Sequence, residues 1–207
     1  MSPGSATAPV IAIDGPAGSG KSTVSRALAA RLGIDRLDTG AMYRAVAWAA
    51  LDQGIDPADR ATVAELAGRL AITVDDRVEA DGTDITEAIR GPAVSAAVSV
   101  VAANPEVRAV LVGRQRLWVA ERGGGVVEGR DIGSVVFPTA DLKVYLTASE
   151  AERARRRAEE GADALARRDR LDSTRSASPL GVAEGARVVD TTERSVDDIV
   201  EELVTWL

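Results

Sequence analysis

A lysine and a serine follow a cluster of glycines near the start of the chain, in the segment "DGPAGSGKST" at residues 14–23. Glycines allow a loop to wrap so closely that its backbone N–H groups converge on phosphate oxygens. The Lys21 ammonium can then reach the β- and γ-phosphates of a nucleoside triphosphate, and the Ser22 hydroxyl can ligate the Mg²⁺ that bridges them. The predicted chemistry is therefore the binding of a nucleoside triphosphate with Mg²⁺.

The elements on either side of this segment support the prediction. An apolar run at residues 9–14 is typical of a buried parallel strand, and apolar residues recur at helical spacing from Val24 to Leu32. Strand, loop and helix are the context of the P-loop pattern G-x-x-x-x-G-K-S, whereas an ordinary glycine-rich turn gives no reason for the adjacent lysine and serine. The predicted ATP-binding residues are Gly15, Pro16, Ala17, Gly18, Ser19, Gly20, Lys21, Ser22 and Thr23, with Lys21 catalytic and Ser22 the metal ligand.

The rest of the chain alternates between helix and strand patterns. Helices are predicted at 39–54, 59–71 and 105–122, and after Ser149 and Ser195. Buried strands are predicted at 126–129, 143–146 and 186–192. Residues 72–90 alternate in short segments broken by Asp-Asp and Asp-Gly, which indicates a small antiparallel insertion. This order predicts an α/β fold with a mostly parallel sheet flanked by helices.

The composition limits the partners that the protein can bind and the residue types that can carry chemistry. The 207 residues are 45% hydrophobic and 28% charged, as in a globular domain, and the net charge of −7 disfavours nucleic acid or an anionic membrane as a partner. Cysteine and histidine are absent, so carboxylates, lysine, arginines and backbone amides must carry any chemistry. We find no signal-peptide pattern and no apolar run long enough to span a membrane, and we predict a cytoplasmic protein.

A P-loop alone is compatible with GTPases, motor and transport ATPases and small-molecule kinases. The only asparagine, Asn104, is followed by proline, so the Asn-Lys-x-Asp loop expected of a guanine-specific switch protein is missing. A kinase needs arginines opposite the P-loop, because negative charge on both substrates must be neutralised. The candidates are Arg44, Arg108, Arg130 with Asp131, and a basic block at 153–175.

Five segments, in order from Val10 onward, together resemble the bacterial cytidylate kinase family of P-loop nucleoside monophosphate kinases. They are "IDGPAGSGKST", "LDTGAMYRA", "VSVVAANPEVRAVLVGRQR", "VVEGRDIGSVVFPTADLKVYLTAS" and "RRDRLDSTRSASPL". The resemblance implies the P-loop kinase fold and transfer of the γ-phosphoryl group of ATP to CMP or dCMP. It also implies one kinase domain at 10–207 after a disordered tail at 1–9, with a monophosphate-binding insertion at 62–122 and a lid at 153–178. The lid sequence is shorter than the family pattern, which predicts a short lid.

The resemblance also implies roles for single residues. Thr39 matches a position near the acceptor, Arg44 and Arg130 match arginines that hold the CMP phosphate, and Ser99, Arg108 and Asp131 match positions that read cytosine. Asp172 matches a sugar contact, and Arg168 and Arg175 match lid arginines that close on the phosphates. The implied substrate-binding set is Thr39, Arg44, Ser99, Arg108, Arg130, Asp131, Asp172 and Arg175, and the implied catalytic set is Lys21, Arg130, Arg168 and Arg175.

Other interpretations stay open on the sequence alone. Asp131 can simply pair with a neighbouring arginine, Ser99 can pack a helix face, and the basic block can be an exposed helix with Glu–Arg pairs. The alternative functions are a P-loop kinase acting on UMP, AMP or a metabolite alcohol, and a nucleotide-binding module without catalysis. The preferred hypothesis is direct in-line transfer from ATP with Mg²⁺ as cofactor, in a monomer without nucleic-acid or membrane partners.

Overall fold

The computed structural model describes residues 8–156 and 181–207. The P-loop and the predicted insertion at 62–122 lie within these ranges. Most of the predicted tail and most of the predicted lid lie outside the described residues, and so do Arg168, Asp172 and Arg175.

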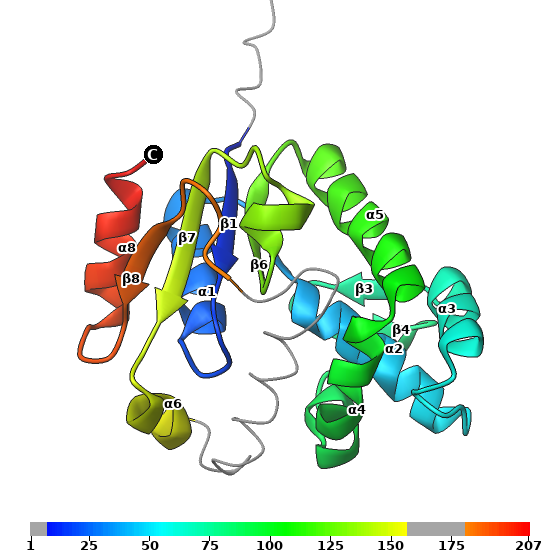
Figure 1. Cartoon of the computed structure of the whole chain (residues 1–207). Coiled ribbons are helices and arrows are strands. Elements are labelled where there is room, and N and C mark those ends of the chain that lie inside the picture. The colour runs from blue at the N-terminus through cyan, green and yellow to red at the C-terminus, as the bar shows by residue number, and fades with distance from the viewer. Residues whose placement is uncertain (1–7, 157–180) are drawn as a thin grey trace, which may run out of the picture.

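Five parallel strands form the central sheet, in the order β2-β6-β1-β7-β8 (Figure 1). They are β1 (Val10–Asp14), β2 (Arg36–Asp38), β6 (Gly125–Gly129), β7 (Leu142–Thr147) and β8 (Arg187–Asp190). β1 lies between β6 and β7, with Asp14 in register with Gly129 and Tyr145. Because all the strands are parallel, their carboxyl ends meet at one edge, where open α/β sheets bind ligands.

Helices cover both faces of the sheet, as its apolar strands require. α1 (Lys21–Leu32) and α8 (Val196–Val204) lie on one face, and α2 (Thr39–Asp52) and α5 (Pro105–Arg122) lie on the other (Figure 1). Successive β1 side chains point to opposite faces, so Ile11 and Ile13 pack in the core with α1 and α8, whereas Ala12 packs with α2. This confirms the predicted α/β fold with a parallel sheet flanked by helices.

The antiparallel insertion predicted at 72–90 is present beside α2. It contains β3 (Ile72–Val74), β4 (Val78–Ala80), β5 (Thr83–Asp84) and the short helix η1 (Ala88–Arg90), with α3 (Arg60–Arg69) before it and α4 (Pro92–Ala103) after it. β3, β4 and β5 pair antiparallel. Asp81 and Gly82, which join β4 to β5, both have positive φ, as expected for a tight Asp-Gly hairpin turn.

The sequence patterns do not predict α4, β2 or the π-helical turn η2 (Ile132–Val136). The α4 sequence "PAVSAAVSVVAA" is uncharged and rich in valine, so its helical period does not separate it from a buried strand. β2 has three residues, which is too short for a period. The structure also ends α2 at Asp52 and α3 at Arg69, each two residues before the predicted limit.

Asn104 separates α4 from α5 and fixes a bend of 92° between them. Its side chain caps α5 by accepting hydrogen bonds from the amides of Glu106 and Val107, and its Nδ2 donates to the Arg60 carbonyl. In the described ranges 8–156 and 181–207, no single helix is long and apolar enough to cross a membrane. The bent pair of α4 and α5 passes that test by length and composition only.

α5 gives a direct test of where the core lies. Leu111 is fully buried on its inner face, whereas the Leu117 side chain on the same helix is 57% exposed. We expect Leu111→Ala to lower the free energy of unfolding by about 2–5 kcal/mol, and the matched control Leu117→Ala to change it by less than about 0.5 kcal/mol. Urea denaturation followed by circular dichroism measures both, and equal effects would contradict this packing.

Candidate active site

The P-loop wraps around the start of α1, as the glycine pattern predicts. Gly15 has φ +149°, and a Cβ atom there would lie 2.1 Å from the Leu146 carbonyl oxygen, so only glycine fits. Lys21 is buried, and its Nζ donates a 2.7 Å hydrogen bond to the Pro16 carbonyl, whereas Ser22 is exposed. The loop therefore combines an ammonium group with the positive end of a helix dipole, an arrangement suited to phosphate.

Glu128 on β6 places a buried carboxylate beside the P-loop. Its Oε1 accepts a 2.7 Å hydrogen bond from Arg36 Nη1, and its Oε2 has no hydrogen-bond partner among the described residues. Burial raises the pKa of Glu128 and Asp38 raises it further, whereas Lys21, Arg36 and the nearby Ser22 hydroxyl lower it. One carboxylate oxygen is thus held by an arginine, and the Ser22 hydroxyl lies close to the same carboxylate.

Thr39 begins α2 and lies against the end of β6. Its Oγ1 donates a 2.7 Å hydrogen bond to the Glu128 carbonyl oxygen. A Cβ atom on Gly129 would lie 2.6 Å from Ile132 Cδ1 and 2.8 Å from Thr39 Oγ1, so this close approach requires glycine. Asp38 caps α2 with its side chain. The structure therefore brings Thr39 to the carboxyl edge of the sheet, next to Glu128.

Asp14 is a second buried carboxylate, at the end of β1. It accepts hydrogen bonds from the backbone amides of Ile132, at 2.8 Å, and Gly133, at 2.7 Å, which begin the turn η2. Burial raises the pKa of Asp14 to about 6 against the lowering effect of these two amides; Asp131 raises it further and Lys21 lowers it. Asp14 therefore ties the strand before the P-loop to the segment after β6.

Arg108 on α5 and Asp131 after β6 form a buried ion pair. The Arg108 guanidinium also lies over the Tyr43 ring, 5.8 Å from its centroid. The neighbouring Arg130 donates a 3.1 Å hydrogen bond from Nη1 to the Gly15 carbonyl of the P-loop. The Arg108–Asp131 pair thus lies one residue from Arg130, which contacts the P-loop directly.

Arg44 and Ser99 lie on α2 and α4, which pack together. Arg44 Nη1 donates hydrogen bonds to the Ile89 carbonyl, at 2.7 Å, and to Ser95 Oγ, at 3.0 Å. Ser99 is buried one turn after Ser95. The structure therefore fixes Arg44 between α2 and the insertion.

Two arginines of α6 (Glu150–Arg156) contact P-loop carbonyl groups. Arg153 Nη1 donates to the Ala17 carbonyl at 3.3 Å, and Arg156 Nη1 lies 3.4 Å from the Gly18 carbonyl. α6 follows β7, the strand next to β1, so its first turns reach the loop that follows β1. The basic block was predicted from the sequence, but these two contacts were not.

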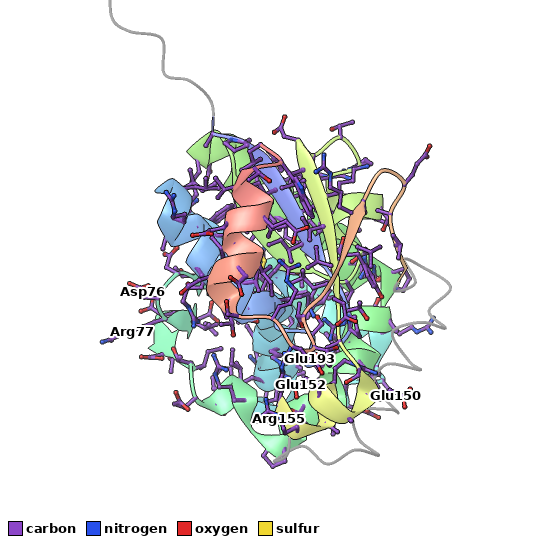
Figure 2. All side chains as sticks on the ribbon, turned by 90° about the vertical axis from the view of Figure 1, so that its left-hand side faces the viewer. Asp76, Arg77, Glu150, Glu152, Arg155 and Glu193 are labelled. Atoms are coloured by element: carbon purple, nitrogen blue, oxygen red, sulfur yellow. The ribbon has the colours of Figure 1, made fainter. Side chains whose placement is uncertain are left out.

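Glu152 orients the second of these arginines. Its carboxylate accepts 2.7 Å hydrogen bonds from Arg155 and Arg156, and the Arg155 hydrogen bond is the main reason why the pKa of Glu152 falls to about 2. Figure 2 shows Glu152 and Arg155 on α6. Arg156 also donates to the Thr191 hydroxyl and carbonyl, at 2.9 and 2.8 Å. The guanidinium is therefore held between α6, the P-loop and the end of β8.

The predicted residues within the described ranges gather around the carboxyl edge of the sheet and the insertion. The contacts join Arg130 to the P-loop, Asp131 to Arg108, and Thr39 to Glu128. Sequence reasoning missed Asp14, Arg36 and Glu128, and it did not single out Arg153 and Arg156 within the basic block that it named. Glu128 carried one usable signal, because it is a charged residue inside the otherwise apolar strand "GVVEG".

The chain is similar in sequence to cytidylate kinases. A profile of the cytidylate kinase family matches residues 11–207. A cytidylate kinase from Pelotomaculum thermopropionicum is 48% identical over 214 residues, which cover 95% of this chain and 94% of the relative. A bifunctional pantoate ligase/cytidylate kinase from Prochlorococcus marinus is 46% identical over 95% of this chain. This chain covers 44% of that relative, so it spans less than half of the bifunctional protein.

A solved gluconokinase from Sinorhizobium meliloti has a similar fold, with a TM-score of 0.50 and 17% sequence identity. The likeness covers 98% of this chain and 93% of that one. At this identity the comparison bears on the fold alone, and it agrees with the predicted P-loop kinase fold.

Asp14 gives the stability of the fold a defined pH dependence. Its pKa is about 6 in the folded protein against a reference of 3.8, so between these values the folded state holds more protons than the unfolded chain. The free energy of unfolding therefore falls as the pH rises. We expect wild type to lose roughly 2 kcal/mol relative to Asp14→Asn between about pH 4 and pH 7, measured by urea denaturation.

Asp59 provides a control of opposite sign. Hydrogen bonds from Thr62 lower the pKa of Asp59, so its contribution to stability is lost as the pH falls. Because this change takes place near and below the reference pKa of 3.8, wild type should lose stability relative to Asp59→Asn as the pH falls below about 4, and the difference should stay nearly constant between about pH 4 and pH 7. A pH-independent difference between wild type and Asp14→Asn would contradict the raised pKa of Asp14.

Proposed function

Because the chain belongs to the cytidylate kinase family, we propose that it transfers the γ-phosphoryl group of ATP to CMP or dCMP, giving ADP and CDP or dCDP. This makes it a phosphotransferase with a phosphate group as acceptor. The observation that carries the proposal is the link between the P-loop and a buried Arg108–Asp131 pair through Arg130. A donor site and an acceptor site are needed side by side for direct transfer.

In the proposed mechanism, the P-loop binds the triphosphate of ATP and arginines bind the acceptor. Lys21 and the amides at the start of α1 neutralise the β- and γ-phosphates. Arg44 and Arg130 hold the CMP phosphate, since a planar guanidinium grips phosphate with two parallel hydrogen bonds. The acceptor phosphate is largely ionised at neutral pH, so its oxygen attacks the γ-phosphorus in line without a strong general base or a covalent enzyme intermediate.

The residues beside the P-loop fit a magnesium ion. Mg²⁺ prefers oxygen ligands, and the Ser22 hydroxyl lies near the buried Glu128 carboxylate, whose Oε2 lacks a hydrogen-bond partner among the described residues. We propose that Ser22 and Glu128 hold the ion, directly or through water. When bound, Mg²⁺ would neutralise negative charge on the triphosphate.

Asp131 and Arg108 account for the proposed choice of cytosine. A carboxylate accepts from the exocyclic N4 amine, and guanidinium donors suit N3 and O2. Uracil carries an acceptor where cytosine carries the amine, so it would leave the buried Asp131 facing another acceptor. A P-loop kinase for UMP, AMP or a metabolite alcohol has no comparable use for this pair, and a non-catalytic nucleotide-binding module has no use for an acceptor site.

Several finer statements stay predictions. They include the domain limits at 10–207, the lid at 153–178 with Arg168, Asp172 and Arg175, and the roles of Thr39 and Ser99 in binding the acceptor. A monomeric state and a cytoplasmic location also stay predictions from the sequence.

The two lysines of the chain offer a matched pair for testing the donor site. Lys21 lies inside the P-loop, whereas Lys143 is a half-buried residue of β7 whose Nζ donates a hydrogen bond to the Glu184 carbonyl. We expect Lys21→Ala to reduce kcat for CMP by about 100-fold or more, because a charge that stabilises the transition state is lost. Lys143→Ala should stay within about twofold of wild type, with circular dichroism confirming that both variants fold. Full activity of Lys21→Ala would refute the proposed donor site.

A panel of acceptors tests the substrate. ATP-dependent transfer to CMP, dCMP, UMP and AMP is measured by a coupled assay, and CMP or dCMP should give the highest kcat/KM. Asp131→Asn keeps the size of the side chain but offers a donor as well as an acceptor, so uracil O4 becomes an acceptable partner. We expect the ratio of kcat/KM for CMP over UMP to fall by about tenfold or more. An unchanged ratio would remove Asp131 from cytosine recognition.

A further inference from the structure

The Asp14 carboxylate connects the strand before the P-loop to the segment that carries Asp131. It belongs to β1, immediately before Gly15, but both of its hydrogen bonds come from the segment after β6. The donors are the amides of Ile132 and Gly133, which directly follow Asp131. One buried side chain thus contacts the backbone next to the residue proposed to read the base.

The local backbone explains why these amides need an acceptor from another strand. Residues 132–136 form a π-helical turn, in which the Phe137 amide bonds the Ile132 carbonyl at 2.7 Å. The first amides of any helical turn have no partner within it, and Asp131, at the capping position, makes no side-chain cap. The Asp131 side chain is committed to Arg108 instead. Asp14 therefore supplies the cap that the turn cannot supply for itself.

Arg130 adds a second link across the same boundary. Its Nη1 donates to the Gly15 carbonyl, so residues 14 and 15 of one strand end contact residues 130, 132 and 133 of the other. Parallel pairing aligns Asp14 with Gly129, so β1 and β6 end side by side and the residues that follow them can make these contacts. Asp131 therefore lies between two contacts with the end of β1 and the P-loop. Arg130, just before it, makes one, and the amides just after it make the other with Asp14.

We propose that Asp14 is a positioning residue that holds residues 130–133, here called the Arg130–Asp131 turn, against the P-loop and thereby sets the selectivity for cytosine. This inference rests on the proposed function, because it assumes that Asp131 reads the base. Asp14 does not touch either substrate in this proposal. It acts through the Ile132 and Gly133 amides on the carboxylate that does.

The charge of Asp14 suits this task at neutral pH. An ionised carboxylate offers an acceptor oxygen to each amide, and hydrogen bonds to a charged group are stronger than those to a neutral one. The positive charge of Lys21 favours the ionised form of Asp14 and lowers its pKa, whereas the negative charge of Asp131 raises this pKa. Because Arg108 is paired with Asp131, the like charge beside Asp14 is partly compensated.

Asp14→Asn tests the proposal with the smallest change in shape. Its amide nitrogen would face one of the two backbone amides donor to donor, so the turn has to shift. Misplacement of a recognition group by about 1 Å can cost on the order of 100-fold in rate. We expect the ratio of kcat/KM for CMP over UMP to fall by about tenfold or more, whereas the Kd for ATP changes by less than about threefold. The ratio does not depend on how much of the enzyme is folded, so a loss of stability alone leaves it unchanged.

Two further measurements test whether Asp14 acts through Asp131 or through a general disturbance of the structure. In the Asp131→Asn background, Asp14→Asn should change the CMP to UMP ratio by less than about twofold, because both variants act on the same carboxylate. Asp59→Asn, which alters the capping aspartate of α3, should leave the ratio unchanged. Independent, multiplying effects of Asp14→Asn and Asp131→Asn would overturn the proposal, and so would an unchanged ratio in Asp14→Asn alone.

Amide hydrogen exchange provides a measurement that needs neither substrate nor turnover. The Ile132 and Gly133 amides of wild type should exchange slowly, and in Asp14→Asn they should exchange about tenfold faster or more. Fast exchange of these amides in wild type overturns the proposal even if the variant does not fold. If wild type transfers no phosphate to CMP, the proposed function fails, while the exchange result still decides whether Asp14 holds the turn.

Discussion

The register between β1 and β6 is the constraint on which the site depends. Parallel pairing places Asp14 beside Gly129, so the loops after both strands leave the sheet at one edge. The loop after β1 is the P-loop, and the segment after β6 carries Arg130 and Asp131. A slip of one residue would turn Ile11 and Ile13 toward the opposite face of the sheet, so the two helical layers that bury these strands also lock the site geometry.

Buried charges then connect the elements that meet at this edge. Arg36 pairs with Glu128 across β2 and β6, and Arg108 pairs with Asp131 across α5 and the segment after β6. Burying such groups is costly, and removing one partner leaves an uncompensated charge, so each pair ties its two elements together. Lys21 and Arg130 also donate to the carbonyl groups of Pro16 and Gly15, so backbone oxygens of the P-loop help to hold both side chains in place.

The sequence was sufficient where a local pattern determines the structure. The P-loop glycines, the apolar run of β1, the Asp-Gly turn at 81–82 and the Asn104-Pro105 helix start each depend on a few neighbouring residues, and all are present. α4 and β2 escaped prediction because valine-rich or very short segments take their structure from tertiary contacts. Asp14 and Glu128 escaped because their partners are more than 90 residues away in sequence, at Ile132, Gly133 and Arg36. The pairing of Arg108 with Asp131 was also open on the sequence, because the two residues lie 23 positions apart on different elements.

The same long-range contacts bear on how binding at one half of the site reaches the other. The P-loop is fixed by β1 on one side and by α6, through Arg153 and Arg156, on the other. The Arg130–Asp131 turn is fixed by Asp14 and by α5. Because Asp14 and Gly15 are consecutive, a shift of the P-loop backbone would also displace the carboxylate that holds the turn, and a shift of the turn would displace the end of β1 in return. Thermodynamic linkage makes any coupling between ligands bound at the two strand ends equal in both directions.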